Sequence, residues 1–513
     1  MTALTAALLA TTLAPSLGRA LAPSPEPIRY VVRIADPRTH YLDVEAVVPT
    51  GGASTIELMM AVWTPGSYLI REFARHVQEV TARDVSGREL VITKSAKNRW
   101  RVRTGGARQV VVHYRVYANE HQPRTNWVDT SFAIINGAPT YLTLVGGPAR
   151  THDVQLQLPV EWTRSLTALV PGRDGVAHHY SAPDYDALVD SPIVVGNPAE
   201  HFFTVDGIRH AVVLVGDTSQ WDAARSARDV QRVVEQARGL WGALPYDRYL
   251  FFNILAGEYD GIEHKGSTGL VAPPAAMASD TAYHAWLQLV AHEFFHAWNV
   301  KRMRPAELGP FDYEHEVYTR SLWIAEGLSD YYSWLLLARA GLATRREALA
   351  DISAAIRALQ ATPGRRIQSV EQASFDAWIK QYRPDENSVN TAISYYIKGS
   401  VVGLVLDARI RHLTAGKKSL DDVMRLAYRR YSGARGYTRA QFRSVAREVA
   451  GADLDQFFQD VLEGTGELDY REALVLYGLR FADASDAAPW TLEPRPDATP
   501  VQRAALEALL GAR

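Results

Sequence analysis

"AHEFFHAWNV", residues 291–300, places two histidines four positions apart, with a glutamate directly after the first. Positions four apart lie on one face of an α-helix, so His292 and His296 can reach one metal ion together. Glu293 lies on the flank of that face, where it can hold a metal-bound water without becoming a ligand. Zinc lowers the pKa of such a water to about 7, and a carboxylate can then take its proton. The spacing predicts a helix that carries a zinc site and its catalytic base.

This short pattern also arises by chance in long chains, often on a solvated helix face. Here the flanking residues are apolar or aromatic, which indicates a buried helix; they are Leu289, Val290, Phe294, Phe295 and Trp298. A glutamate buried between two histidines would be costly without a metal ion. The sequence therefore favours a zinc site over a helix that only buries two imidazoles.

The next helical segment, "LWIAEGLSDYYSWLL" (322–336), supplies a candidate third ligand. Glu326 lies thirty positions after His296, and a catalytic zinc needs three protein ligands and one open position. Asp330, one turn after Glu326, would accept the free ring N–H of a zinc-bound histidine, for which we expect His292. The alternative is that both acids are surface charges, but the Trp, Ile, Leu and Tyr residues around them argue against a solvated face.

The composition narrows the classes of function. The chain of 513 residues carries 55 basic and 57 acidic side chains, so no net field favours nucleic acid or an anionic membrane surface. It contains no cysteine, which excludes disulfides, thiolate zinc sites and cysteine nucleophiles. Any metal must therefore be held by His, Asp or Glu, and we expect no nucleic-acid partner.

The N-terminus has features of an export signal. Residues 1–22 contain an apolar run and end in Ala20-Leu21-Ala22, a small-x-small pattern that precedes signal cleavage. No basic residue lies ahead of the run and Pro23 follows the expected cleavage site, so a disordered extension is the alternative. We expect a periplasmic or secreted protein, and otherwise a cytoplasmic one. No later stretch approaches the about 18 apolar residues of a membrane span, so we expect no integral membrane segment.

Hydrophobic periodicity predicts an α+β protein. From residue 25 to about 200, short alternating runs predict an all-β, sandwich-like domain; the clearest are 30–36, 41–48, 55–63, 99–104, 109–118 and 153–160. Strands at 208–217 and 249–257 flank a helical stretch and predict a small α/β lobe. A mostly helical lobe follows, with helices expected at 281–302, 315–341, 344–360, 391–412, 418–429, 438–450 and 453–462. Residues 481–513 are expected to form a short tail with one helix at 500–510.

Six segments together resemble the glycyl aminopeptidase family of zinc metallopeptidases (peptidase family M sixty-one), which are gluzincins. They are "WTPGSYLIREFARHV" (63–77), "YDGIEHKGST" (259–268), "HEFFHAWNVKRMRP" (292–305), "LWIAEGLSDYY" (322–332), "SYYIKGSVVGLVLD" (394–407) and "LEGTGELDYREAL" (462–474). The resemblance implies an N-terminal β domain over 25–200 and a thermolysin-like catalytic domain over 201–480. It also implies one zinc ion per chain, with His292, His296 and Glu326 as ligands and Glu293 as general base.

Two further residues take their roles from this resemblance. "GIEH" resembles an exopeptidase motif whose glutamate binds the free amino group of the substrate, and Glu263 holds that position, although Ile262 and His264 depart from the motif. The alternative is a loop glutamate without this role. "SYYIKG" resembles a segment whose tyrosine stabilises the oxyanion, which implies Tyr396 and leaves Tyr395 as the alternative.

The sequence therefore predicts a zinc-dependent aminopeptidase that removes an N-terminal residue, preferably small such as Gly or Ala, from peptides with a free N-terminus. Two alternatives stay open, a zinc endopeptidase on the same scaffold and a non-catalytic peptide-binding protein. Family members commonly carry a PDZ domain after the catalytic domain, but residues 481–513 leave no room for one, so we expect it to be lost or truncated. The oligomeric state, the peptide length and the physiological substrate are not defined by the sequence.

Overall fold

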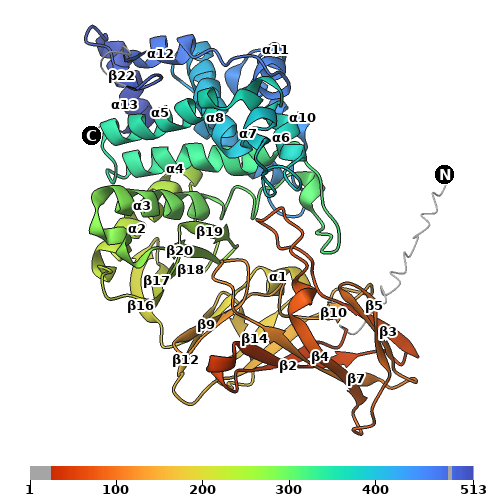
Figure 1. The fold of residues 1–513 in the computed structure, drawn as a ribbon. Helices are drawn as coiled ribbons and strands as arrows, with labels where there is room; N and C mark the ends of the chain where they lie inside the picture. Colours follow the sequence, from red (N-terminus) through yellow and green to blue (C-terminus); the bar gives the residue numbers. More distant parts are fainter. Residues whose placement is uncertain (1–24, 483–487, 512–513) are drawn as a thin grey trace, which may run out of the picture.

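A β-rich N-terminal half and a largely helical C-terminal half make up the chain (Figure 1). The computed structural model describes residues 25–482 and 488–511. The candidate signal peptide, residues 1–22, lies outside the described residues. The predicted α+β class, with a β domain ahead of a mostly helical lobe, is confirmed.

Three sheets form the N-terminal domain, in the strand orders β13-β14-β11-β1-β2-β7-β4, β10-β3-β6-β5 and β12-β15-β9-β8. Apolar residues alternate with polar ones along β2 and β7, so one face of each strand enters a common core. The elements are β1 (Ile28–Arg33), β2 (Tyr41–Pro49), β3 (Thr55–Met59), β4 (Val77–Asp84), β5 (Ile92–Ala96), β6 (Arg99–Arg103), β7 (Gln109–Tyr117), β8 (Trp127–Val128), β9 (Phe132–Ile135), β10 (Thr143–Leu144), β11 (His152–Gln157), β12 (Arg164–Thr167), β13 (Val170–Pro171), β14 (His179–Ala182), α1 (Tyr185–Val189) and β15 (Ile193–Gly196).

A five-stranded sheet in the order β16-β17-β18-β20-β19 begins the catalytic half. Its strands are β16 (Ala199–Val205), β17 (Ile208–Gly216), β18 (Arg248–Leu255), β19 (Asp260–Glu263) and β20 (Ser267–Ala272). One face packs against α2 (Ala223–Trp241) and α3 (Asp280–Phe295), and the other packs against β9 and β15 of the N-terminal domain. Because both faces are covered, β17 and β18 are nearly continuous apolar runs. β19 forms one edge of this sheet.

Helices account for most of the remaining chain. They are α4 (Leu328–Arg339), α5 (Arg345–Ala361), α6 (Val370–Phe375), α7 (Ser388–Thr391), α8 (Tyr395–Leu413), α9 (Leu420–Tyr431), α10 (Arg439–Ala450), α11 (Asp455–Phe458), α12 (Arg471–Tyr477) and α13 (Pro500–Leu510), with π-helical turns at Trp323–Gly327 and Gln459–Glu463. The short strands β21 (Leu479–Phe481) and β22 (Leu492–Pro494) pair near the end of the described chain. The helix predicted at 500–510 is α13.

Two predicted helices are shorter than their periodicity indicated. The helix predicted over 281–302 ends at Phe295. It could not extend to residue 302, because Val300 adopts a φ of +94°, which is incompatible with an α-helix. The helix predicted over 315–341 begins with the π-helical turn at Trp323. The Asp312 carboxylate accepts the backbone N–H groups of Glu314 and His315, and such local bonds compete with helix formation.

The segment Ser388–Leu413 has the length and apolarity of a membrane span, so the expectation that no later stretch would approach one was wrong. In the fold, 61% of its most apolar window is buried inside the protein. Its helix α8 packs against α4, α5 and α12, and its charged residues Asp407 and Arg411 pair with each other at 2.9 Å. The length and apolarity of this segment therefore reflect the position of α8 as a central helix of the protein core.

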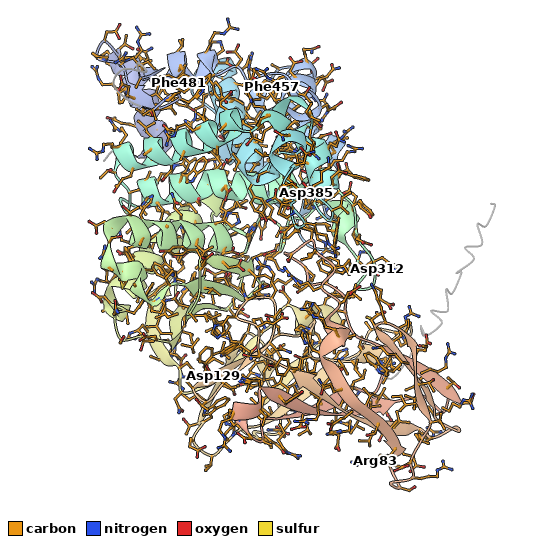
Figure 2. All side chains as sticks on the ribbon, in the orientation of Figure 1. Arg83, Asp129, Asp312, Asp385, Phe457 and Phe481 are labelled. Carbon is orange, nitrogen blue, oxygen red and sulfur yellow. The ribbon has the colours of Figure 1, made fainter. Side chains whose placement is uncertain are left out.

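The two halves share an extensive junction. Figure 2 shows Asp312 at the level where the β domain meets the helical lobe. Its carbonyl oxygen accepts a hydrogen bond of 2.7 Å from the indole N–H of Trp63, which belongs to the loop after β3. Arg99 of β6 also pairs with Glu314 at 2.6 Å. These contacts hold the loop after β3 against the C-terminal half.

Candidate active site

Three helical segments bring the predicted metal ligands together. His292 lies in the last turn of α3, His296 is the residue that ends this helix, and Glu326 lies in the π-helical turn before α4. The amide of Asn299, just past α3, donates to the carbonyl oxygens of Ile324 and Ala325 at 2.8 and 3.1 Å. These bonds fix the π-helical turn, whose own carbonyls lack regular α-helical partners, against the end of α3. Glu326 therefore faces the two histidines.

The three donor atoms form a nearly equilateral triangle. The Nε2 atoms of His292 and His296 are 3.0 Å apart. Glu326 Oε2 lies 3.2 Å from His296 Nε2 and 3.5 Å from His292 Nε2. Zinc–ligand bonds of about 2.1 Å in a tetrahedron place neighbouring donors about 3.4 Å apart. The triangle therefore has the size that a zinc ion requires.

The contacts of the two Nδ1 atoms leave both Nε2 atoms facing each other and Glu326. His296 Nδ1 lies 2.9 Å from the carbonyl oxygen of Asn299, which can only accept, so Nδ1 carries the proton. His292 Nδ1 lies 2.7 Å from Asp330 Oδ1, the contact expected for Asp330 from the sequence. With both Nδ1 atoms protonated, neither Nε2 can donate to the other. Such an arrangement fits a metal cation between them.

Three buried carboxylates surround the same point, and each has one oxygen without a hydrogen-bond partner among the described residues. These oxygens are Glu263 Oε1, Glu293 Oε2 and Glu326 Oε1. Burial raises the pKa of Glu293, although the neighbouring imidazoles oppose this effect. Burial acts in the same direction on Glu326, but contacts with His296 and His292 hold its pKa below the ordinary value. A cluster of this kind calls for cations, which a metal ion and a substrate ammonium would supply.

Glu263 lies at the end of the edge strand β19, with only 3% of its surface exposed. Its carboxylate packs on Gly66 of the β domain, where a Cβ atom would come within 2.5 Å of Oε2 and where φ is +96°. The cleft therefore requires glycine at position 66. Behind Glu263, the buried Lys301 pairs with Asp190 at 2.6 Å. His264 is buried beside the same aspartate, 3.5 Å away, rather than on the cleft wall.

Tyr396 and Tyr395 occupy different environments at the start of α8. The ring of Tyr396 lies on the cleft wall, with its centroid 6.1 Å from that of His292. Tyr395 is fully buried and packs behind it. The hydroxyl of Tyr396 lies 3.2 Å from that of Tyr382, and burial raises the pKa of both phenols, so both stay protonated near neutral pH. The structure thus brings Tyr396, and not Tyr395, to the metal ligands.

The open cleft, of about 490 Å³, contains residues that the sequence interpretation missed. Arg124, from the β domain, holds Asp260 with hydrogen bonds of 2.5 and 2.8 Å and also donates to the carbonyl oxygen of Gly261 at 2.8 Å. Gly66 lies in the segment 63–77, which resembles the family but carries no local pattern that indicates a contact with Glu263. No local pattern marks Arg124. The β domain therefore forms one wall of the cleft.

Comparisons with known proteins agree with this architecture. The model of the peptidase M61 N-terminal domain matches residues 29–197, and the model of the M61 glycyl aminopeptidase matches residues 285–402. An aminopeptidase N family protein from Idiomarina loihiensis is 29% identical, with a TM-score of 0.85 over 89% of this chain and 79% of that one. The M1 zinc metallopeptidase from Deinococcus radiodurans, 13% identical, has a TM-score of 0.52 over 87% of this chain and 95% of its own. A mutant of it bound to a Tyr-Ser-Ala substrate gives the same values. No curated protein matches the sequence.

The fold and the site together define a metallo-aminopeptidase, in which a buried His-His-Glu triangle lies beside Glu293 and Tyr396. Both halves of the chain match models of one family of such enzymes. The chain belongs to the M61 glycyl aminopeptidase family.

Proposed function

We propose that the protein is a zinc-dependent aminopeptidase, with one zinc ion per chain, that hydrolyses the first peptide bond of peptides with a free N-terminus. The observation that carries this proposal is the position of Glu263. Its ligand atom lies within 4.8 Å of those of Glu293 and His296, and its Oε1 is buried without a partner among the described residues. An α-ammonium bound there would satisfy the carboxylate and hold the first peptide bond beside the metal ligands.

In the proposed reaction, each residue acts on a different atom. His292, His296 and Glu326 would hold a zinc ion, which supplies an electrophile for the scissile carbonyl and lowers the pKa of water. Glu263 binds and orients the substrate ammonium. Glu293 takes a proton from the attacking water and gives it to the leaving amine, a role for which its raised pKa is suited. The Tyr396 hydroxyl donates to the carbonyl oxygen as negative charge develops on it.

A preference for small N-terminal residues is supported by the space next to Glu263. The cavity bordered by Gly66 and Glu263 has a volume of only about 30 Å³. Its wall combines the large side chains of Trp63, Tyr68 and Phe311 with charged ones, among them Asp190, Lys301 and Arg304. This volume is on the order of one water molecule or one methyl group. We therefore expect Gly and Ala at the N-terminus to be accepted better than Leu or Phe.

The decisive experiment compares peptides with free and N-acetylated termini. We expect Ala-Ala-Ala to be cleaved and N-acetyl-Ala-Ala-Ala to be resistant, because acetylation removes the ammonium that pairs with Glu263. In the same assay, Glu263→Gln should lower kcat/KM for the free peptide more than kcat/KM for the acetylated peptide. Equal cleavage of both peptides by the native enzyme would favour the endopeptidase alternative, and cleavage of neither, with zinc bound, would favour a peptide-binding protein.

A further inference from the structure

The β domain places two arginines, Arg124 and Arg71, near Asp260 of β19, and the two guanidinium groups have different partners. Arg124 is neutralised by Asp260, and its terminal nitrogens donate to that carboxylate and to the carbonyl oxygen of Gly261. Asp260 precedes Glu263 by three positions on β19, which is about 10 Å along an extended strand. This distance is about the length of two to three residues of an extended peptide. A peptide whose ammonium is bound by Glu263 would therefore end near these arginines.

Arg71 has no carboxylate partner among the described residues. Its one side-chain hydrogen bond goes to Ser67 Oγ at 2.8 Å, and its Nε is buried without a partner. The acids nearest to it are already engaged, Asp260 by Arg124 and Glu120 by Arg75 at 2.6 Å. Burial, reinforced by the charge of Arg124, lowers the pKa of Arg71 to about 10, so the guanidinium remains charged at neutral pH. A half-buried cation with free donors is suited to an anionic ligand.

The position of Arg71 connects it to the catalytic cleft. Arg71 and Gly66 belong to the same loop, and Ser67, the partner of Arg71, directly follows the glycine that packs on Glu263. On its other side Arg71 lines an open groove of about 450 Å³ together with Tyr382 and the exposed Arg383. Two acids also line this groove, but Glu72 is paired with Lys97 and Glu120 with Arg75. The hydroxyl of Tyr382 is 3.2 Å from that of Tyr396 on the cleft wall. The groove and the cleft are therefore neighbours, separated by the pair of tyrosines Tyr382 and Tyr396.

We propose that Arg71 binds the C-terminal carboxylate of the substrate, so that the enzyme acts preferentially on di- and tripeptides with a free C-terminus. This inference rests on the proposed aminopeptidase function. A guanidinium can bind a carboxylate through two parallel hydrogen bonds, which gives both charge and orientation. Arg383, at the rim of the groove, adds positive charge that attracts the same group. Glu263 and Arg71 would then bind the two charged ends of the substrate, and the distance between them would limit the length of the peptide.

The test is the ratio of kcat/KM for Ala-Ala-Ala to that for its C-terminal amide. We expect the native enzyme to prefer the free acid by about tenfold or more, because hydrogen bonds to a charged group contribute that much. In Arg71→Gln the ratio should fall to about one. In Arg71→Lys it should take an intermediate value, because lysine keeps the positive charge but lacks the planar guanidinium that forms two parallel hydrogen bonds. Because the ratio is taken within one enzyme preparation, partial loss of folded protein cancels.

Two controls identify the source of the carboxylate. Arg101→Gln removes an equal charge from an exposed arginine that pairs with Glu57 elsewhere in the β domain, and it should leave the ratio unchanged. Ala-Glu-amide carries a side-chain carboxylate but no terminal one, and we expect it to be cleaved as slowly as Ala-Ala-amide. Rapid cleavage of Ala-Glu-amide would show that the groove binds acidic side chains instead, which would overturn the proposal.

The failure of this proposal is distinguishable from failure of the aminopeptidase function. Equal cleavage of acid and amide by the native enzyme, or an unchanged ratio in Arg71→Gln, would overturn the role of Arg71 while Ala-p-nitroanilide is still hydrolysed. If no substrate is hydrolysed, the proposed function fails, and calorimetry on the zinc-loaded Glu293→Gln variant still decides the role of Arg71. That variant should bind Ala-Ala-Ala more tightly than its amide, and adding Arg71→Gln should remove the difference.

Discussion

Asp330 Oδ1 lies 2.7 Å from His292 Nδ1, on the side of the imidazole that faces away from the metal triangle. This contact fixes the tautomer in which Nε2 is free to bind a metal ion. Removing it should therefore weaken metal binding without removing a ligand.

We predict that Asp330→Asn lowers the zinc affinity by about 10- to 100-fold and that excess zinc restores most of the activity. Competition with a chromogenic chelator measures the affinity. The control is Asp351→Asn, which alters a similar contact of 2.9 Å to His284 outside the cleft and should leave zinc binding unchanged. An unchanged zinc affinity in Asp330→Asn would show that the contact does not support the metal site.

We predict that Gly66→Ala impairs the binding of the substrate ammonium, because the new methyl group would overlap the carboxylate of Glu263. KM for Ala-p-nitroanilide should rise by about tenfold or more, as for the loss of a charged hydrogen bond. Gly52→Ala is the matched control, since Gly52 also has a left-handed φ, of +83°, but has no atom near the position of a Cβ. Equal effects of the two substitutions on KM would mean that only backbone strain, and not contact with Glu263, is involved.

We predict that Tyr396→Phe lowers kcat by about 100- to 1000-fold, with KM and zinc content little changed, because a donor to the developing oxyanion is lost. Tyr395→Phe serves as the control, since this buried tyrosine does not reach the cleft. Steady-state kinetics on both variants decides the question left open by the adjacent tyrosines in the sequence. A larger loss in kcat for Tyr395→Phe would reverse the assignment.

Stability should decrease in mild acid because of two buried histidines outside the site. Burial lowers the pKa of His152 and of His210 to about 4. The unfolded chain, with histidine pKa values of about 6.5, then binds protons that the folded chain does not, so the free energy of unfolding falls as the pH drops from about 6.5 to 4. Each histidine contributes on the order of 3 kcal/mol to this loss.

The measurement is the melting temperature across that pH range. His152→Gln should give a flatter dependence on pH than the native protein, and His210→Gln, as the matched comparison, should do the same. Parallel curves for all three proteins would show that these two histidines do not cause the acid sensitivity.

The sequence predicts the part of the site that is encoded locally. His292 and His296 are on one helical turn, and the apolar surroundings of Glu326 indicate a buried acid, so both could be recognised from spacing and composition. The π-helical form of the turn at Glu326 was not predicted, because it differs from an α-helix by one residue per turn and leaves the same apolar pattern. Its position depends on Asn299, whose amide contacts are made only in the folded state.

The contribution of the β domain to the cleft could not be predicted from local patterns. Arg124 and Asp260 are 136 positions apart, and neither lies in a periodic segment that would indicate a contact. Gly66 and Arg71 lie in a loop, where the absence of periodicity removes the main sequence signal. These residues acquire their roles only through the packing of the β domain on the catalytic half.

The most direct test of the account is zinc content and turnover of Glu293→Gln, measured on the same sample. Glutamine keeps the size of the side chain but cannot take a proton, so we expect one zinc ion per chain and a loss of kcat of about a thousandfold. The native protein and a chelator-treated sample provide the references for full and absent zinc. Turnover within about tenfold of the native enzyme would contradict a role for Glu293 as general base. Loss of the zinc ion would instead show that this residue is a metal ligand.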